Sequence, residues 1–141
     1  MRDTLEVLVI AAGVGQLILC GASLAIPRVL GWRRQVKGLR PLTRQVFWTY
    51  AAYIWGTHLA FGLLSTFGAD LLVAGSRLAG CVTGFITVYW LARIGIQFFY
   101  FDTTGLPTGA GIRFAEAGLV LLFILLTLVY GFATVTNLAG P

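Results

Sequence analysis

An arginine within a long apolar stretch is the residue of this sequence best placed to do chemistry. Arg93 lies in the apolar run 78–101, with Tyr89 four positions before it and Gln97 four positions after it. Residues four apart share one face of a helix, so these three side chains form a polar stripe. Because an arginine near the centre of a membrane helix costs about 2.5–3.5 kcal/mol, we expect Arg93 to face other helices or a wet cleft. Such a stripe is suited to binding a quinone, a lipid or another amphiphile.

Polar residues recur at similar depths in the other apolar stretches of the chain. Hydrogen bonds among them would spare each group the cost of facing lipid. We therefore predict a ligand-binding polar seam that runs from the cytoplasmic side to the midplane, formed by Gln16, Tyr53, His58, Tyr89, Arg93, Gln97 and Glu116. Glu116 is the acid expected to balance the charge of Arg93, either through Gln97 or through water.

The single histidine, His58, limits the cofactors that the chain can hold. One histidine cannot supply both axial ligands of a haem within one chain, so a haem or pigment site requires a symmetric dimer or a single axial imidazole. The alternative is a neutral histidine hydrogen-bonded to Tyr89, Thr57 or Gln16. No Cys/His spacing typical of a metal site is present, and the two cysteines differ too much in expected depth to form a disulfide. The sequence therefore predicts neither a metal nor a cofactor.

The elements that position these residues are four long apolar stretches. The chain has 141 residues, of which 58% are hydrophobic and only 11% are charged, and its mean hydropathy is +0.88. Soluble domains contain about 25% charged residues, and a membrane-spanning helix needs about 20 mostly apolar residues. Stretches of this length cover residues 5–26, 46–67, 78–101 and 114–138. We expect a single-domain, all-α integral membrane protein whose four spans form an antiparallel transmembrane helix bundle.

The segment 27–45 between the first two stretches is strongly basic and contains no acid. Since Lys and Arg stay on the cytoplasmic side, we place this link in the cytosol and both termini outside, in a membrane of the bacterial cytoplasmic type. Its pattern is also that of a short interfacial helix with Trp32 at headgroup depth. The charges attract anionic lipid headgroups or an acidic partner, or they only fix the topology. They are Arg33, Arg34, Lys37, Arg40 and Arg44. Nucleic acid is not an expected partner, because no aromatic platform or recognised module accompanies the charges.

Small residues at helical spacing indicate where helices approach closely. Gly80 and Gly84 form a GxxxG pair in the third stretch, and Gly21 and Ala25 form a related pair in the first. Small side chains allow membrane helices to come close together, either within the bundle or between subunits. Contacts with other membrane subunits or with further copies of the chain are therefore expected.

Three classes of function are compatible with this layout. The small size and the absence of a catalytic motif favour a non-catalytic accessory or structural subunit that packs with other membrane helices. The seam at His58, Arg93 and Gln97 favours a binding or transport protein for a quinone, a lipid or another amphiphile. The third class is a small membrane enzyme, because the four spans and the basic first loop resemble the layout of the membrane-associated glutathione and eicosanoid enzymes. The second stretch lacks the acidic-arginine-asparagine motif of that family, so the resemblance assigns no residue.

Overall fold

The computed structural model describes residues 1–101 and 109–139 as an all-helical chain. Within these residues 88% are helical and none forms a strand. Four long helices, α1 (Arg2–Ser23), α4 (Pro41–Phe67), α6 (Arg77–Phe99) and α7 (Ala110–Leu138), make up most of the fold. The short elements are α2 (Ile26–Val29), α3 (Trp32–Gln35), the 3-10 turn η1 (Val36–Gly38) and α5 (Ala69–Leu72). The prediction of an all-helical fold is confirmed.

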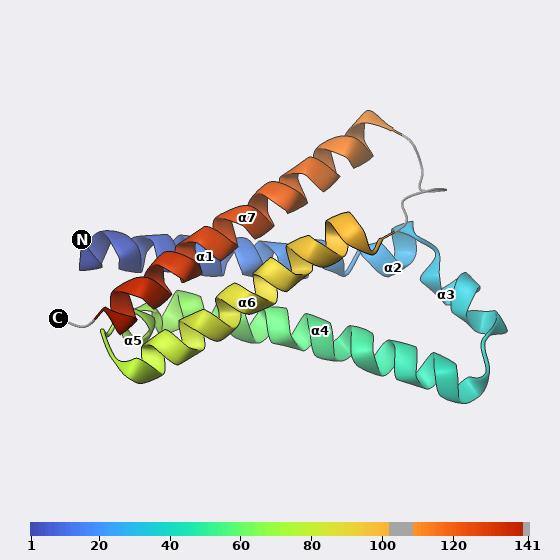
Figure 1. Cartoon of the computed structure of the whole chain (residues 1–141). Coiled ribbons are helices and arrows are strands. Elements are labelled where there is room, and N and C mark those ends of the chain that lie inside the picture. Colours follow the sequence, from blue (N-terminus) through green and yellow to red (C-terminus); the bar gives the residue numbers. More distant parts are fainter. Residues whose placement is uncertain (102–108, 140–141) are drawn as a thin grey trace.

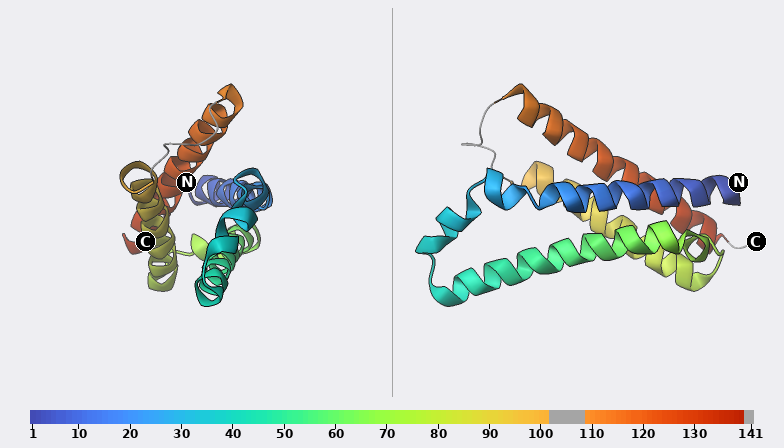
Figure 2. Two further views of the ribbon diagram at one scale, coloured as in Figure 1. Left: turned by 90° about the vertical axis from the view of Figure 1, so that its right-hand side faces the viewer. Right: turned by 180° about the vertical axis from the view of Figure 1, so that it is seen from behind.

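The long helices pack as two antiparallel pairs (Figure 1). Helix α1 lies against α4, α6 lies against α7, and contacts between α1 and α7 join the two pairs. Both termini and α5 lie at one end of the molecule, and α2 and α3 lie at the other end. The views in Figure 2 show that the beginnings of α4 and α7 diverge from the other helices at the α2–α3 end. The bundle is therefore closed at the end that holds the termini and splayed at the end that holds the basic link.

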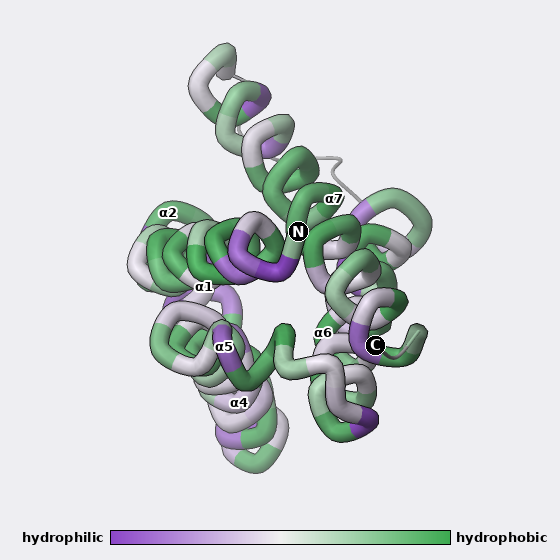
Figure 3. The backbone as a smooth tube through the Cα atoms, turned by 90° about the vertical axis from the view of Figure 1, so that its left-hand side faces the viewer, coloured by the Kyte–Doolittle hydropathy of each residue, from purple (hydrophilic) through white to green (hydrophobic). Residues whose placement is uncertain are grey.

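Helix α4 differs in composition from the other three long helices. Three segments are long and apolar enough to cross a membrane, namely Arg2–Val29, Arg77–Phe99 and Ala110–Leu138. Helix α4 has 27 residues and reaches about 40 Å at 1.5 Å per residue, so its length suffices. Its polar and glycine residues lower its hydropathy, and Figure 3 shows it paler than α1 and α7. Of the four expected spans, three are thus long and apolar enough to cross a membrane, and α4 falls short in composition rather than in length.

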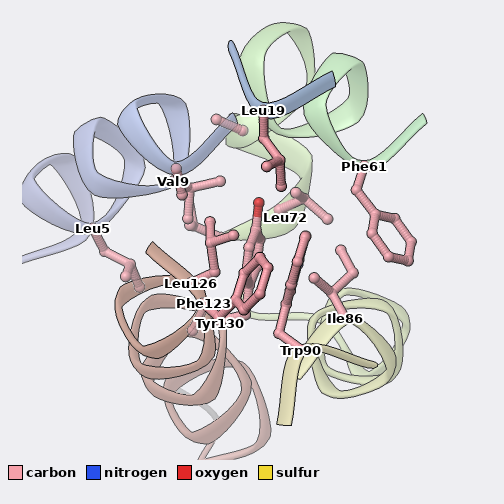
Figure 4. Packing of buried hydrophobic residues seen from close by; sticks show 14 residues of the cluster. Leu5, Val9, Leu19, Phe61, Leu72, Ile86, Trp90, Phe123, Leu126 and Tyr130 are labelled. Carbon is pink, nitrogen blue, oxygen red and sulfur yellow. The ribbon is translucent and has the colours of Figure 1, made fainter. Parts of the chain in front are cut away.

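The core lies where α1, α6 and α7 meet, and residues of α4 and α5 complete it (Figure 4). Val9, Ile86, Trp90 and Tyr130 have no exposed surface, and Leu126 retains 1%. Where helices lie in lipid, a core of this kind depends on close packing and hydrogen bonds, because lipid tails are as apolar as the side chains. The distance between the helix axes therefore decides how well this core is held.

Glycines set the distance between α6 and α7. A Cβ at Gly80 would lie 2.6 Å from Cδ2 of Leu138, and a Cβ at Gly84 would lie 3.4 Å from Cγ2 of Thr134. The sequence left open whether these glycines pack within the bundle or between subunits. Gly80 and Gly84 pack against α7, within the bundle. A Cβ at Gly21 would meet no atom within 4 Å. Gly21 therefore makes no close helix contact within the bundle.

The close approach of α1 and α4 depends on two glycines that the sequence analysis did not single out. A Cβ at Gly13 would lie 2.7 Å from the backbone N of Thr66, and a Cβ at Gly62 would lie 2.8 Å from Cδ2 of Leu17. Both glycines are buried. Neither belongs to a GxxxG pair, so the spacing that marked Gly80 gave no signal here.

The basic link 27–45 forms two short helices, a 3-10 turn and the first turn of α4, not the single interfacial helix that its pattern predicted. Gly31 breaks the helix between α2 and α3 by adopting the left-handed conformation, with φ of +63°, which favours glycine. Trp32 then packs edge-on against Phe47 at 5.3 Å and lies 6.5 Å from Trp48, so it is held by the beginning of α4. The basic residues singled out in the link are all exposed, namely Arg33, Arg34, Lys37, Arg40 and Arg44.

Candidate functional site

The residues predicted to form one polar seam lie in two clusters and at one exposed position. The first cluster consists of Gln16 together with Ser65 and Tyr130, two residues that the sequence analysis did not single out, and we call it the buried junction. Gln16 Nε2 donates a hydrogen bond to the Tyr130 hydroxyl at 2.6 Å, and the hydroxyls of Ser65 and Tyr130 share a hydrogen bond of 2.5 Å. All three side chains are fully buried and join α1, α4 and α7. Gln16 Nε2 and the two hydroxyls are thus paired within the protein, whereas Gln16 Oε1 is buried without a hydrogen-bond partner among the described residues. Because its hydrogen bonds join three helices, the buried junction contributes to the stability of the bundle.

The second cluster begins with a stack of aromatic rings between α4, α6 and α7. His58 Nε2 shares a hydrogen bond of 2.8 Å with the Tyr89 hydroxyl, one of the partners that the sequence suggested. The His58 ring stacks on Trp90 with centroids 4.9 Å apart, and Trp90 stacks on Phe123 at 5.2 Å. Figure 4 shows Trp90 and Phe123 side by side in the core. Because Trp90 is fully buried between these rings, the stack fixes the part of α6 from which Arg93 projects.

Arg93 leads a row of polar groups from α6 to α7, and we call Arg93, Gln97 and Glu116 the arginine row. Nη1 of Arg93 donates to Oε1 of Gln97 at 3.4 Å, and Nε2 of Gln97 donates to Oε1 of Glu116 at 3.5 Å. Both distances exceed the usual range of about 2.7–3.2 Å, so these bonds are weak. The contact between Arg93 and Glu116 is indirect and runs through Gln97, the arrangement that the sequence suggested.

Two aromatic rings hold the Arg93 guanidinium in place. Its central carbon lies 5.1 Å from the centre of the Phe101 ring and 5.2 Å from that of Phe123. Cation–π contacts of this kind attract a guanidinium to the ring face and leave its charge intact. Neither ring was singled out from the sequence as a site residue. Phe123 follows Glu116 by seven positions and so shares its helix face, and that spacing was the available signal.

The arginine row runs from the interior of the bundle to its surface. Arg93 is half-buried, and Glu116 is exposed. Arg93 lies six residues before the end of α6 at Phe99, which is about 9 Å along the helix axis. The row therefore connects a half-buried charge with the surface of the bundle near its splayed end.

Tyr53 lies outside both clusters, with 71% of its surface exposed, so the structure does not bring it to the predicted seam. It lines a shallow groove of about 540 Å³ on the outward face of α4, which we call the α4 groove. The lining residues are Thr49, Ala52, Tyr53, Gly56, Thr57 and Ala60.

A second shallow groove, of about 460 Å³, lies on the surface of α6 and α7, and we call it the α6–α7 groove. Its lining residues are Phe98, Arg113, Glu116, Ala117, Val120, Leu121 and Ile124. Glu116 therefore belongs both to the arginine row and to this groove. The remainder of the lining is mostly apolar, apart from Arg113, which precedes Glu116 by three positions and so lies on the same side of α7.

Other kinds of site find no support in the described part of the chain. Residues 1–101 and 109–139 contain no group of three His, Cys, Asp or Glu side chains able to hold a metal ion, and Cys20 and Cys81 are free. Comparisons with protein-family models, with curated proteins and with solved structures found no match. The chemistry of the arginine row and of the two grooves therefore carries the functional argument.

Proposed function

We propose that this protein is a non-catalytic, four-span membrane protein that binds an amphiphile beside Arg93. Helices α1, α6 and α7 are apolar enough to supply three of the spans. Helix α4 packs antiparallel against α1, so it occupies the same slab of the bilayer and supplies the fourth. The basic link 27–45 then lies in the cytosol and both termini lie outside, because Lys and Arg stay on the cytoplasmic side.

The observation that carries the proposal is the position of the Arg93 guanidinium. It is half-buried at the depth of a membrane span, and two aromatic rings hold it. An ionisable group at that depth is expensive and generally serves a function. The arginine row offers polar partners for a headgroup, and the adjacent α6–α7 groove offers apolar surface for a tail. These are the two parts that a binding site for an amphiphile requires.

Native mass spectrometry of the protein purified in mild detergent tests this proposal. We expect the wild-type protein to carry a bound amphiphile, visible as a mass adduct and recoverable by organic extraction. Arg93→Gln should lose the adduct. Arg77→Gln removes an exposed arginine at the opposite end of α6 and should retain it. A wild-type protein without an adduct, or equal retention by both variants, would contradict the proposal.

A second candidate function, that of an accessory or structural subunit, is supported by the α4 groove. A Cβ at Gly56, in the centre of this groove, would meet no atom within 4 Å, so another helix has room to approach α4 closely. Gly21 is equally open but lies on α1. If α4 packs against another membrane helix, Gly56→Leu should release that partner in native mass measurements and Gly21→Leu should not. Retention of the same partner by both variants and the wild type, or no partner on any of them, would exclude this use of α4.

The basic link is the proposed point of contact with anionic lipid headgroups. Its arginines and lysine are exposed, and each such charge near an anionic membrane surface contributes about 1 kcal/mol. Replacing Arg33 and Arg34 by Gln should therefore reduce the anionic lipid that co-purifies with the protein. The adduct that depends on Arg93 should remain, because it is bound at a different place.

A further inference from the structure

We infer that the amphiphile is a single-chain lipid with an anionic headgroup, such as a fatty acid, and not a planar quinone. Its headgroup would lie at the arginine row and its chain in the α6–α7 groove. This inference rests on the proposed function and specifies the ligand of the same site. Three observations support it: the aromatic stack is closed, the arginine row ends in a carboxylate, and the adjoining groove is shallow and mostly apolar.

The aromatic stack leaves no place for a flat ligand. The centroids of His58 and Trp90 are 4.9 Å apart with an interplanar angle of 25°, and those of Trp90 and Phe123 are 5.2 Å apart at 26°. A ring inserted between two others needs contacts of about 3.5 Å on each face, so the outer rings would have to be about 7 Å apart. Both spacings are shorter than that. The rings that a quinone would use are therefore already in contact with each other.

The arginine row indicates the charge of the headgroup. Glu116, an exposed residue, places its own carboxylate at the end of the row, 3.5 Å from Nε2 of Gln97. A carboxylate from a ligand presents the same oxygens and can replace it, because this bond is long and weak. Arg113, which lines the same groove, adds a second positive charge beside the headgroup. Glu116 would thus compete with the ligand for the donors of Gln97 and Arg93.

The α6–α7 groove indicates the shape of the tail. Ala117, Val120, Leu121 and Ile124 line it along successive turns of α7 and begin one residue after Glu116. From Ala117 to Ile124 this apolar lining extends about 10 Å along the helix. A single acyl chain can lie along such a surface with its acidic end at Glu116. The groove is short, shallow and open to one side, so an acyl chain can lie along it, whereas it does not enclose a ring.

Binding of oleate, compared with decylubiquinone, to the full chain in uncharged detergent tests this inference. We expect saturable binding of oleate, weakened about tenfold or more in Arg93→Gln and tightened about threefold in Glu116→Gln, since one tenfold step corresponds to 1.4 kcal/mol. Arg77→Gln, at the far end of α6, should leave oleate binding unchanged. Glu116 is exposed, so its variant folds normally and keeps the test decisive even where Arg93→Gln does not fold.

The alternative outcomes separate the parts of the argument. Binding of decylubiquinone but not oleate, lost in Arg93→Gln, would overturn the inference about the ligand and keep the proposed function. If neither probe binds in a manner that depends on Arg93, both the proposed function and the inference about the ligand are wrong. If acetate or inorganic phosphate competes as strongly as oleate, the site binds free anions, and the proposed role of the acyl chain is overturned. Weaker oleate binding in Glu116→Gln would overturn the placement of the headgroup.

Discussion

Replacing Gly13 by alanine tests the close contact between α1 and α4. The added Cβ would lie 2.7 Å from the backbone N of Thr66 and 2.9 Å from the carbonyl carbon of Ser65. To relieve this clash, the distance between the added Cβ and the backbone N of Thr66 must grow from 2.7 Å to the ordinary contact distance of about 3.4 Å, an increase of about 0.7 Å. Because the opposing atoms belong to the backbone, no side-chain rotation relieves the clash and the helices must separate. A gap of about 0.5–1 Å forfeits a quarter to a half of the dispersion energy of each contact.

Overpacking of this kind costs about 1–3 kcal/mol, and we expect the upper half of that range because the whole helix pair moves apart. Thermal unfolding in detergent, followed by tryptophan fluorescence, measures the effect. The midpoint should fall by about 2–4 °C for each kcal/mol in a chain of this size.

Gly21→Ala is the matched control, since it makes the same chemical change on the same helix at a position with no atom within 4 Å. Alanine is intrinsically favoured over glycine in a helix by up to about 1 kcal/mol, so this variant should keep or raise the midpoint. Equal midpoints for the two variants would refute the reasoning, because they share the change in helix propensity and differ only in packing.

Other substitutions test the buried junction, the topology and the role of the histidine. Tyr130→Phe removes the hydroxyl shared by the buried junction and should cost about 1–3 kcal/mol in thermal unfolding, whereas Tyr53→Phe, at an exposed position, should cost nothing measurable. In a variant without the native cysteines, Gln35→Cys and Asp70→Cys should react with a membrane-impermeant reagent from opposite sides of the membrane, and reaction from one side would show that α4 does not cross. His58→Phe preserves an aromatic ring in the stack and should leave oleate affinity unchanged; a loss of binding would place the ligand at the imidazole instead.

Hydrophobic runs predicted the helices well and their beginnings less well. The third stretch, 78–101, and α6 (Arg77–Phe99) differ by one or two residues at each end. Helix α4 begins at Pro41, five residues before the predicted start at Val46, because its first turn is polar and contributes nothing to an apolar run. The mean hydropathy of α4 is low because threonine, tyrosine and glycine residues lie on its outward face. The sequence shows these residues, but hydropathy alone does not show which face of the helix lies outward.

Spacing along one helix predicted more of the site than matching depths between helices. The link from Arg93 to Gln97 follows directly from their separation of four residues. Depth matching placed Gln16 with His58 and added Tyr53, but depth says nothing about the rotation of each helix around its axis. That rotation turns Gln16 toward Tyr130 and leaves Tyr53 on the outside. The close approach of α1 to α4 at Gly13 likewise depends on how the surfaces of the two helices fit together. The hydrophobic pattern of either helix alone does not contain that information.

Photolabelling with a fatty acid that carries a diazirine on its chain tests the central claim most directly, with the modified peptides identified by mass spectrometry. The account predicts labels on α7 between Ala117 and Ile124, reduced by an excess of oleate and absent in Arg93→Gln. Labels confined to the α4 groove, or labels on α7 of undiminished strength in Arg93→Gln, would contradict it.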